Sequence, residues 1–246
     1  IHAGIYYPTG SLKAHLCVRG KALLYEYCEE RKIPYSNCGK VIVASNESQI
    51  KTVVGYIEKA RSNGVCDLEW IDADHLNQLE PNVSGVGAVM SPSTGIIDSH
   101  AYMLSLQGDL ERNGGVISFS TNVTEIRTAP ELIVVTPEFE LSAQWVINCG
   151  GLDAPLLSAG LGNAPDAYFA KGHYYSYLGA QPFSRLVYPV AEEGGLGVHV
   201  TLDLAGQVKF GPDVRWIDSI DYSFDDSHKA DFVSAIRSYF PNVEED

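Results

Sequence analysis

The chain has 246 residues, of which 45% are hydrophobic and 10% aromatic. This composition is enough for a sizeable core in one large or two intermediate domains, and it excludes global disorder. The formal net charge of -14 argues against a nucleic-acid partner, because phosphate binding needs clustered Lys and Arg. No apolar run reaches the roughly 18 residues that span a bilayer, so any membrane association would be peripheral.

The chain has five cysteines, Cys17, Cys28, Cys38, Cys66 and Cys149. They are scattered, and none stands in a CxxC or Cys/His spacing, so we expect no zinc or other metal site. Free thiols of this kind are typical of a reducing compartment, which here means the cytoplasm or the mitochondrion.

The first half of the chain alternates helices with short strands. Residues 11–32 form the first expected helix, with Ser11 as N-cap and with Leu12, Leu16, Leu23 and Tyr27 on one face. The next elements, in chain order, are a buried strand at 41–44, a helix at 46–63, a short helix capped by Asp72 or Asp74, a strand at 86–90, a turn at 91–95 and a helix from 98 or 99 to 113.

The second half is richer in strands. The expected strands lie at 116–119, 123–126, 132–135 and 145–148, with more between 170 and 211, and a closing helix covers 226–239. The whole pattern predicts an α+β fold.

The opening residues combine a histidine, two small residues and two tyrosines. Ala3 and Gly4 carry almost no side chain, so another backbone or a flat ligand can approach closely there. The alternative is a frayed end whose aromatic rings pack in an ordinary way.

The segment 145–155 predicts an apolar strand that runs into Gly150 and Gly151 and then a helix. Such a turn permits close approach to a nucleotide, but it is also typical of a strand–helix turn that needs glycine only for its dihedral angles. The full G-x-G-x-x-G fingerprint is absent, because the segments at 85–87, 160–162 and 195–197 supply only its first two glycines.

Three later strands carry tyrosine and histidine at 171–175, 186–190 and 196–201. Alternating side chains of such strands can project polar groups into a shared cavity. His173 is one residue out of phase with Tyr174 on a strand and is expected to point away. The alternative for His199 is a core histidine with its hydrogen bonds satisfied.

These segments carry a family resemblance. The run Ile1–Tyr7, its continuation through Leu12-Lys13-Ala14, and the segments 91–100, 145–155 and 186–212 resemble the L-2-hydroxyglutarate dehydrogenase/oxidase family of FAD-dependent oxidoreductases, which is related to D-amino-acid oxidase. The resemblance implies the central part of a longer enzyme. Residues 1–40 and 95–165 would belong to an incomplete Rossmann-like FAD-binding domain. Residues 41–94 and 166–246 would form a substrate domain with an antiparallel sheet.

The resemblance also implies roles for individual residues. His199 would be the base that accepts the hydroxyl proton, and His2 would position the flavin or the substrate, or the two roles would be exchanged. Tyr7, Tyr174 and Tyr175 would bind substrate. The cofactor contacts would be His2, Ala3, Gly4, Ile5, Val123, Cys149, Gly150 and Gly151. Lys13, Lys171 and Arg185 are either partners of a substrate carboxylate or surface charges.

The expected reaction is oxidation of a small 2-hydroxy acid to the 2-oxo acid, with hydride transfer to flavin N5 and an electron acceptor that the sequence does not identify. Two alternatives remain, namely an amine or amino-acid oxidase of the same superfamily and a non-catalytic binding module that lacks the nucleotide loop. Because the pyrophosphate loop is missing, we expect the isolated 246 residues to be inactive and to purify without flavin.

Overall fold

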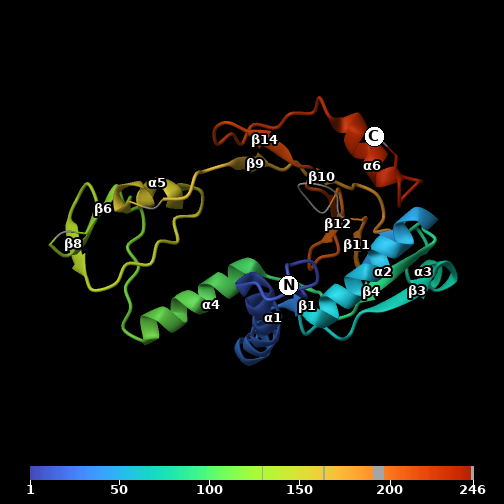
Figure 1. Cartoon of the computed structure of the whole chain (residues 1–246), viewed down its shortest axis with the longest axis horizontal. Coiled ribbons are helices and arrows are strands. Elements are labelled where there is room, and N and C mark those ends of the chain that lie inside the picture. The colour runs from blue at the N-terminus through green and yellow to red at the C-terminus, as the bar shows by residue number, and fades with distance from the viewer. Residues whose placement is uncertain (129, 163, 191–196, 245–246) are drawn as a thin grey trace. The chain divides into compact units, whose positions relative to one another are not determined.

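The computed structural model describes residues 1–128, 130–162, 164–190 and 197–244. The chain forms two compact units. Unit 1 comprises Ile1–Asp109, Lys171–Arg215 and Asp221–Asp246, and unit 2 comprises Leu110–Ala170 and Trp216–Ile220. Helices and sheets are mixed in the chain (Figure 1), as the sequence predicts.

A seven-stranded sheet forms the framework of unit 1. Its strand order is β10-β13-β12-β11-β2-β4-β3. The strands are β2 (Lys40–Ala44), β3 (Glu69–Asp72), β4 (Gly87–Ser91), β10 (Tyr175–Ser176), β11 (Leu186–Tyr188), β12 (Val200–Leu202) and β13 (Val208–Phe210). The β11–β2 pair is parallel and the other five pairs are antiparallel. The parallel pair joins strands far apart in sequence, so the sheet is mixed where an antiparallel one was predicted.

The helices of unit 1 follow their sequence signals closely. They are α1 (Leu12–Arg31), α2 (Glu47–Ser62), α3 (Ala73–Leu79), α4 (Ser99–Arg112, which continues into unit 2) and α6 (Lys229–Arg237). The Ser11 and Asp72 side chains cap α1 and α3 by accepting hydrogen bonds from backbone N–H groups three residues on. A small separate sheet pairs β1 (Tyr35–Ser36) with β5 (Ile96–Ile97).

The core of unit 1 lies around β2, whose five residues are all buried. Helix α2 packs on β2 and β4, and α6 packs on the face that carries Tyr175, whose ring meets Phe232 at 4.8 Å. A buried polar contact also links α3 to β11. The Glu80 carboxylate, 1% exposed, accepts hydrogen bonds from the Ser184 backbone and from Arg185, which tie the end of α3 to the start of β11.

Unit 2 is built on the antiparallel sheet β6-β7-β8. Its elements are β6 (Glu125–Arg127), β7 (Leu132–Val135), β8 (Glu140–Ala143), the 3₁₀ turns η1 (Gly151–Asp153) and η2 (Ala159–Leu161), and the helix α5 (Ala154–Ser158). The strands β9 (Phe169–Lys171) and β14 (Arg215–Ile217) pair where the chain passes between the units.

Two sequence-based expectations are wrong in unit 2. The segments 116–119 and 145–148 do not form strands. Val116, Trp145 and Ile147 expose 86–89% of their surface, so these apolar runs find no pairing partner among the described residues. A continuous apolar run is typical of a strand in a parallel sheet, but a strand exists only where a neighbour supplies its hydrogen bonds.

Candidate active site

Strand register places a group of polar side chains on one face of the seven-stranded sheet. Val187 pairs with Val200, so the adjacent residues Tyr188 and His199 both point to the opposite face from these valines. Lys40 pairs with Leu186, two residues before Tyr188, and therefore lies on the same face as Tyr188. We call this the site face.

The side chains on the site face form a stacked group. The Tyr188 and His199 rings are parallel to within 24°, with centroids 4.0 Å apart. The Lys40 Nζ lies 4.5 Å from the centroid of Tyr188 and 4.8 Å from that of Tyr6. The amine is thus held between two aromatic rings, beside the candidate base.

His199 is 8% exposed, and its hydrogen bond defines its tautomer. Its Nδ1 lies 3.0 Å from the carbonyl oxygen of Gly197, so Nδ1 carries the proton and Nε2 keeps a lone pair. Burial, together with the nearby positive charges of Lys40 and His2, lowers the pKa of His199 to about 4. His199 is therefore neutral at pH 7 and has a free acceptor nitrogen.

Lys40 is 3% exposed and is the least expected member of the group. Its amine makes no hydrogen bond or ion pair with the residues that the structure describes. Burial lowers the pKa of Lys40 to about 7. The protonated form of this buried amine has no carboxylate among the described residues to act as its counter-charge.

The N-terminal segment reaches the same group. His2 interacts electrostatically with both Lys40 and His199, and its pKa is lowered by desolvation and then by neighbouring positive charges, Lys40 and Lys13 among them. The Tyr7 ring lies 4.7 Å from the Lys13 amine, and Tyr7 interacts electrostatically with Tyr188. The structure therefore brings the predicted residues His2, Tyr7 and His199 together.

The small residues of this segment have a structural role. Gly4 has a φ of +95°, and a Cβ there would lie 2.7 Å from the Val18 side chain. Ala3 and Ile5 are each only 2% exposed. At Gly4, helix α1 thus makes the close approach that the sequence predicts for Ala3 and Gly4.

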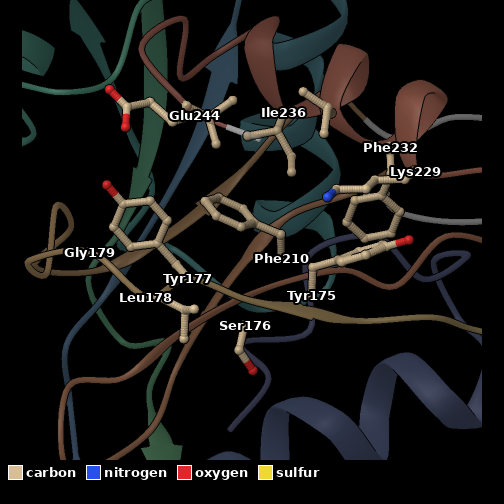
Figure 2. A pocket seen from close by; sticks show the side chains of 12 residues that line it. Tyr175, Ser176, Tyr177, Leu178, Gly179, Phe210, Lys229, Phe232, Ile236 and Glu244 are labelled. Carbon is tan, nitrogen blue, oxygen red and sulfur yellow. The ribbon is translucent and has the colours of Figure 1, made fainter. Parts of the chain in front are cut away.

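The two adjacent candidate tyrosines, Tyr174 just before β10 and Tyr175 within it, point in different directions. Tyr175 pairs with Phe210, which itself pairs with Val200, so Tyr175 points away from the site face. The expectation that Tyr175 shares the cavity of Tyr174 is wrong, because successive residues of a strand point to opposite faces. Figure 2 shows Tyr175 with Phe232 in a different cavity, of about 290 Å³, against α6.

Tyr174 does lie on the site face. It interacts electrostatically with Tyr188 and is 49% exposed. Its ring passes over Gly211, where a Cβ would lie 2.8 Å from the Tyr174 ring. Glycine at this position thus lets the tyrosine lie close to β13.

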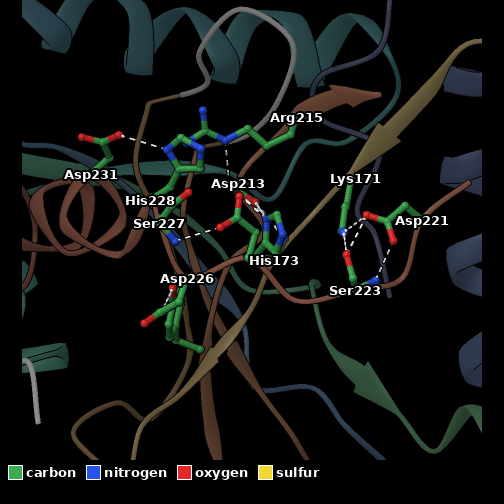
Figure 3. A network of polar contacts seen from close by, with 12 residues as sticks. Lys171, His173, Asp213, Arg215, Asp221, Ser223, Asp226, Ser227, His228 and Asp231 are labelled. Atoms are coloured by element: carbon green, nitrogen blue, oxygen red, sulfur yellow. Dashed lines mark hydrogen bonds and ion pairs between the residues drawn. The ribbon is translucent and has the colours of Figure 1, made fainter. Parts of the chain in front are cut away.

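Two of the three cations considered as carboxylate partners already have protein partners. Lys171 Nζ lies 2.7 Å from an Asp221 carboxylate oxygen, and Arg185 bonds to the buried Glu80. Figure 3 shows Lys171 with Asp221 and Ser223, and in a separate group His173, whose Nδ1 lies 3.0 Å from Asp213.

The remaining cofactor candidates lie in unit 2 and are described by themselves. Gly150 and the exposed Cys149 belong to a turn held by Asn148, whose side-chain oxygen accepts a hydrogen bond from the Gly150 N–H. Gly151 has a φ of +60° and begins η1, and Val123 precedes β6. Their contacts with a cofactor remain predictions.

Sequence reasoning missed Lys40 and Tyr188. One signal was available, namely a lysine directly before the apolar run 41–44. A lysine at the start of a strand is ordinarily exposed, however. Only the pairing of β2 with β11, nearly 150 residues later, places Tyr188 over the amine.

A family model described as FAD dependent oxidoreductase (DAO) matches residues 1–246. The chain belongs to this family. Three curated members have related sequences, all called L-2-hydroxyglutarate dehydrogenase. The Arabidopsis thaliana mitochondrial protein is 35% identical over 100% of this chain and 61% of its own length. The Escherichia coli K12 protein is 30% identical over 98% of this chain and 60% of its own length. The human mitochondrial protein is 34% identical over 86% of this chain and 50% of its own length.

Several solved structures share the fold of this chain. L-α-glycerophosphate oxidase from Mycoplasma pneumoniae, with FAD bound, superimposes with a TM-score of 0.87 at 21% identity, over 99% of this chain and 67% of that one. Glycine oxidase from Geobacillus kaustophilus superimposes with a TM-score of 0.82 at 16% identity, over 97% of this chain and 66% of that one. The predicted family and mixed α+β fold are confirmed. The chain spans about 50–61% of the length of these three curated relatives. In the part of the chain that the structure describes, no helix is both long and apolar enough to cross a membrane.

Proposed function

We propose that the full-length protein is an FAD-dependent oxidoreductase that converts a small 2-hydroxy acid of the L-2-hydroxyglutarate type to the 2-oxo acid. The observation that carries the proposal is His199, a neutral imidazole whose Nε2 is free to accept a proton. The names of the relatives, at 30–35% identity, support the choice of substrate.

The residues of unit 1 fit a flavin and an anionic substrate. Their donor set is cationic and neutral, with the unpaired Lys40 amine beside His199, and no carboxylate is among the groups that shift the pKa values of His2, Lys40 and His199. A flavin gains negative charge when it is reduced, and a hydroxy acid carries negative charge on its carboxylate. Cations of this kind stabilise both. The acidic chain thus holds, beside His199, an amine that can carry a positive charge without a neighbouring carboxylate to balance it.

When bound, FAD supplies the acceptor for the hydride that leaves C2 of the substrate. The chain supplies the other half of the reaction. His199 Nε2 accepts the proton of the C2 hydroxyl as the C2–H bond breaks, and the carbon–oxygen single bond becomes the double bond of the 2-oxo acid. The Gly197 carbonyl holds the imidazole in the required tautomer. His2 orients the flavin or the substrate from the adjoining segment.

The test uses the full-length protein loaded with FAD. L-2-hydroxyglutarate, its D enantiomer, L-glutamate and glycine are each offered with dichlorophenolindophenol or with oxygen as acceptor, since the physiological acceptor is open. We expect turnover with the L-hydroxy acid. Oxidation of the amino acids alone would instead favour an amino-acid oxidase, and flavin-free protein without turnover would favour a binding module.

His199→Asn tests the assignment of the base. We expect kcat to fall 10²–10⁴-fold, the usual contribution of a general base. His75→Gln is the matched control, because His75 is an exposed histidine on α3.

The names of the plant and human relatives place them in mitochondria, and the five free cysteines agree with a reducing compartment for this protein.

A further inference from the structure

We propose that Lys40 is the anion anchor of the active site, and that its amine binds the carboxylate next to the reacting carbon of the substrate. This inference deepens the proposed function and rests on it. It makes Lys40 the residue that distinguishes a 2-hydroxy acid from an uncharged alcohol.

The first argument is the missing counter-charge. The Lys40 amine lies in a 3% exposed position between the Tyr6 and Tyr188 rings. These rings hold the cation in place, but they offer no anion. Lys171 and Arg185, by contrast, already bind Asp221 and Glu80. Lys40 is therefore available to a carboxylate from outside the protein.

The second argument is distance. The amine lies 4.5 Å, and the His199 centroid 4.0 Å, from the centroid of the same Tyr188 ring. The amine and the imidazole centroid are therefore no more than about 8.5 Å apart. A 2-hydroxy acid carries its hydroxyl and its carboxylate on adjacent carbons. This limit is compatible with one molecule that bonds to both groups through contacts of about 2.8 Å each.

Binding of the carboxylate also improves the base. The positive charge of Lys40 is one of the influences that lower the pKa of His199. Below pH 7, where the amine is protonated, a bound carboxylate neutralises that charge, so the substrate raises the proton affinity of the imidazole that must accept its hydroxyl proton. His199 therefore becomes an effective base only when the bound ligand carries a carboxylate.

The site also predicts how binding depends on pH. The groups that face the amine are the Tyr6 and Tyr188 rings, together with His2, His199 and Cys17. His2 and His199 both have lowered pKa values, so Lys40 is the cation expected to lose its proton near pH 7. Above that pH, a carboxylate must bring a proton onto the amine, and its affinity falls up to tenfold per pH unit.

The experiment measures binding of 2-oxoglutarate and of the monocarboxylate 2-oxobutyrate to the full-length, oxidised, FAD-loaded enzyme. Flavin absorbance reports binding, and calorimetry at pH 8 in two buffers of different ionisation enthalpy reports proton uptake. For wild type we expect uptake of close to one proton. For Lys40→Met we expect a roughly 30-fold or greater loss of affinity for both acids, typical of a lost charge-assisted hydrogen bond. Lys51→Met, an exposed lysine on α2, is the charge-matched control and keeps wild-type affinity.

Three outcomes overturn the proposal. The first is absence of proton uptake by wild type, which needs no variant. The second is a loss confined to 2-oxoglutarate, which would place the distal carboxylate on Lys40. The third is unchanged affinity with a lowered flavin midpoint potential, which would mean that the amine serves the reduced flavin.

The two proposals fail separately. If L-2-hydroxyglutarate is not oxidised but both oxo acids bind through Lys40, the proposed substrate is wrong and the anchor stands. If Lys40→Met oxidises L-2-hydroxyglutarate with unchanged KM, the proposed function stands and the anchor is wrong.

Discussion

Replacing Lys40 by methionine removes a buried charge while keeping the length of an unbranched side chain. The fall in the Lys40 pKa from 10.5 to about 7 corresponds to roughly 5 kcal/mol, at about 1.4 kcal/mol per pH unit. The two aromatic contacts offset part of this cost, because each cation–π contact is worth about 0.5–2 kcal/mol. We therefore expect the free energy of unfolding of Lys40→Met to exceed that of wild type by about 1–4 kcal/mol at pH 6.

The sign of the pH dependence follows from linkage. The pKa of Lys40 is lower in the folded chain than in the unfolded chain, so the destabilisation is complete below pH 7 and is lost as the pH rises from 7 to 10.5. The advantage of Lys40→Met should therefore shrink over this range. Urea unfolding of the full-length apoprotein at pH 6, 8 and 10 measures it. A variant that is less stable than wild type at pH 6, or an advantage that does not change with pH, would refute the reasoning.

Two further changes test the framework around the site. Glu80→Ala leaves Arg185 without its buried partner, so we expect thermal or urea unfolding to show a loss of about 3 kcal/mol; a loss below 1 kcal/mol would contradict a structural role for this ion pair. Gly4→Ala forces a Cβ onto Val18 at a φ of +95°, with an expected loss of about 2 kcal/mol. Its matched control is Gly20→Ala, inside α1 with no atom within 4 Å of the new Cβ, where a gain of up to about 1 kcal/mol is expected. Equal effects of the two substitutions would rule out the packing argument.

The helices were predictable because their signals are local. The Ser11 side chain accepts a hydrogen bond from Ala14 N–H at 3.1 Å, and Asp72 caps α3 in the same way. Capping residues and apolar spacing lie within a few positions of the ends that they determine. The predicted limits of α1 and α2 therefore differ from the observed ones by a single residue at each end.

The same local pattern does not identify what a helix face will contact. Leu12, Leu16 and Leu23 on α1 are 50–72% exposed, and the buried residues of that helix are Ala14 and Cys28. Periodicity shows that a face is apolar, but the identity of its partner depends on the rest of the fold. The strands predicted at 116–119 and 145–148 were wrong for the same reason.

The residues of the candidate site show the same difference between local sequence signals and long-range contacts. His199 was selected through the family resemblance of its segment, because a histidine among apolar residues is by itself equally typical of a core position. Lys40 could not be selected, because its significance comes from two rings that lie far from it in sequence, Tyr6 and Tyr188. Tyr175 was misplaced because a pair of adjacent tyrosines says nothing about which one faces the site until register is known.

Stability and binding should share one titration. Protonation of Lys40 destabilises the ligand-free fold and strengthens carboxylate binding, so the two properties depend on pH in opposite directions through the same group. The midpoint at which the stability difference between wild type and Lys40→Met begins to shrink should therefore match the midpoint at which wild type begins to lose affinity for 2-oxoglutarate. A binding midpoint well below the stability midpoint would assign the binding titration to His2, whose pKa is also lowered. That result would move the anchor from β2 to the N-terminal segment.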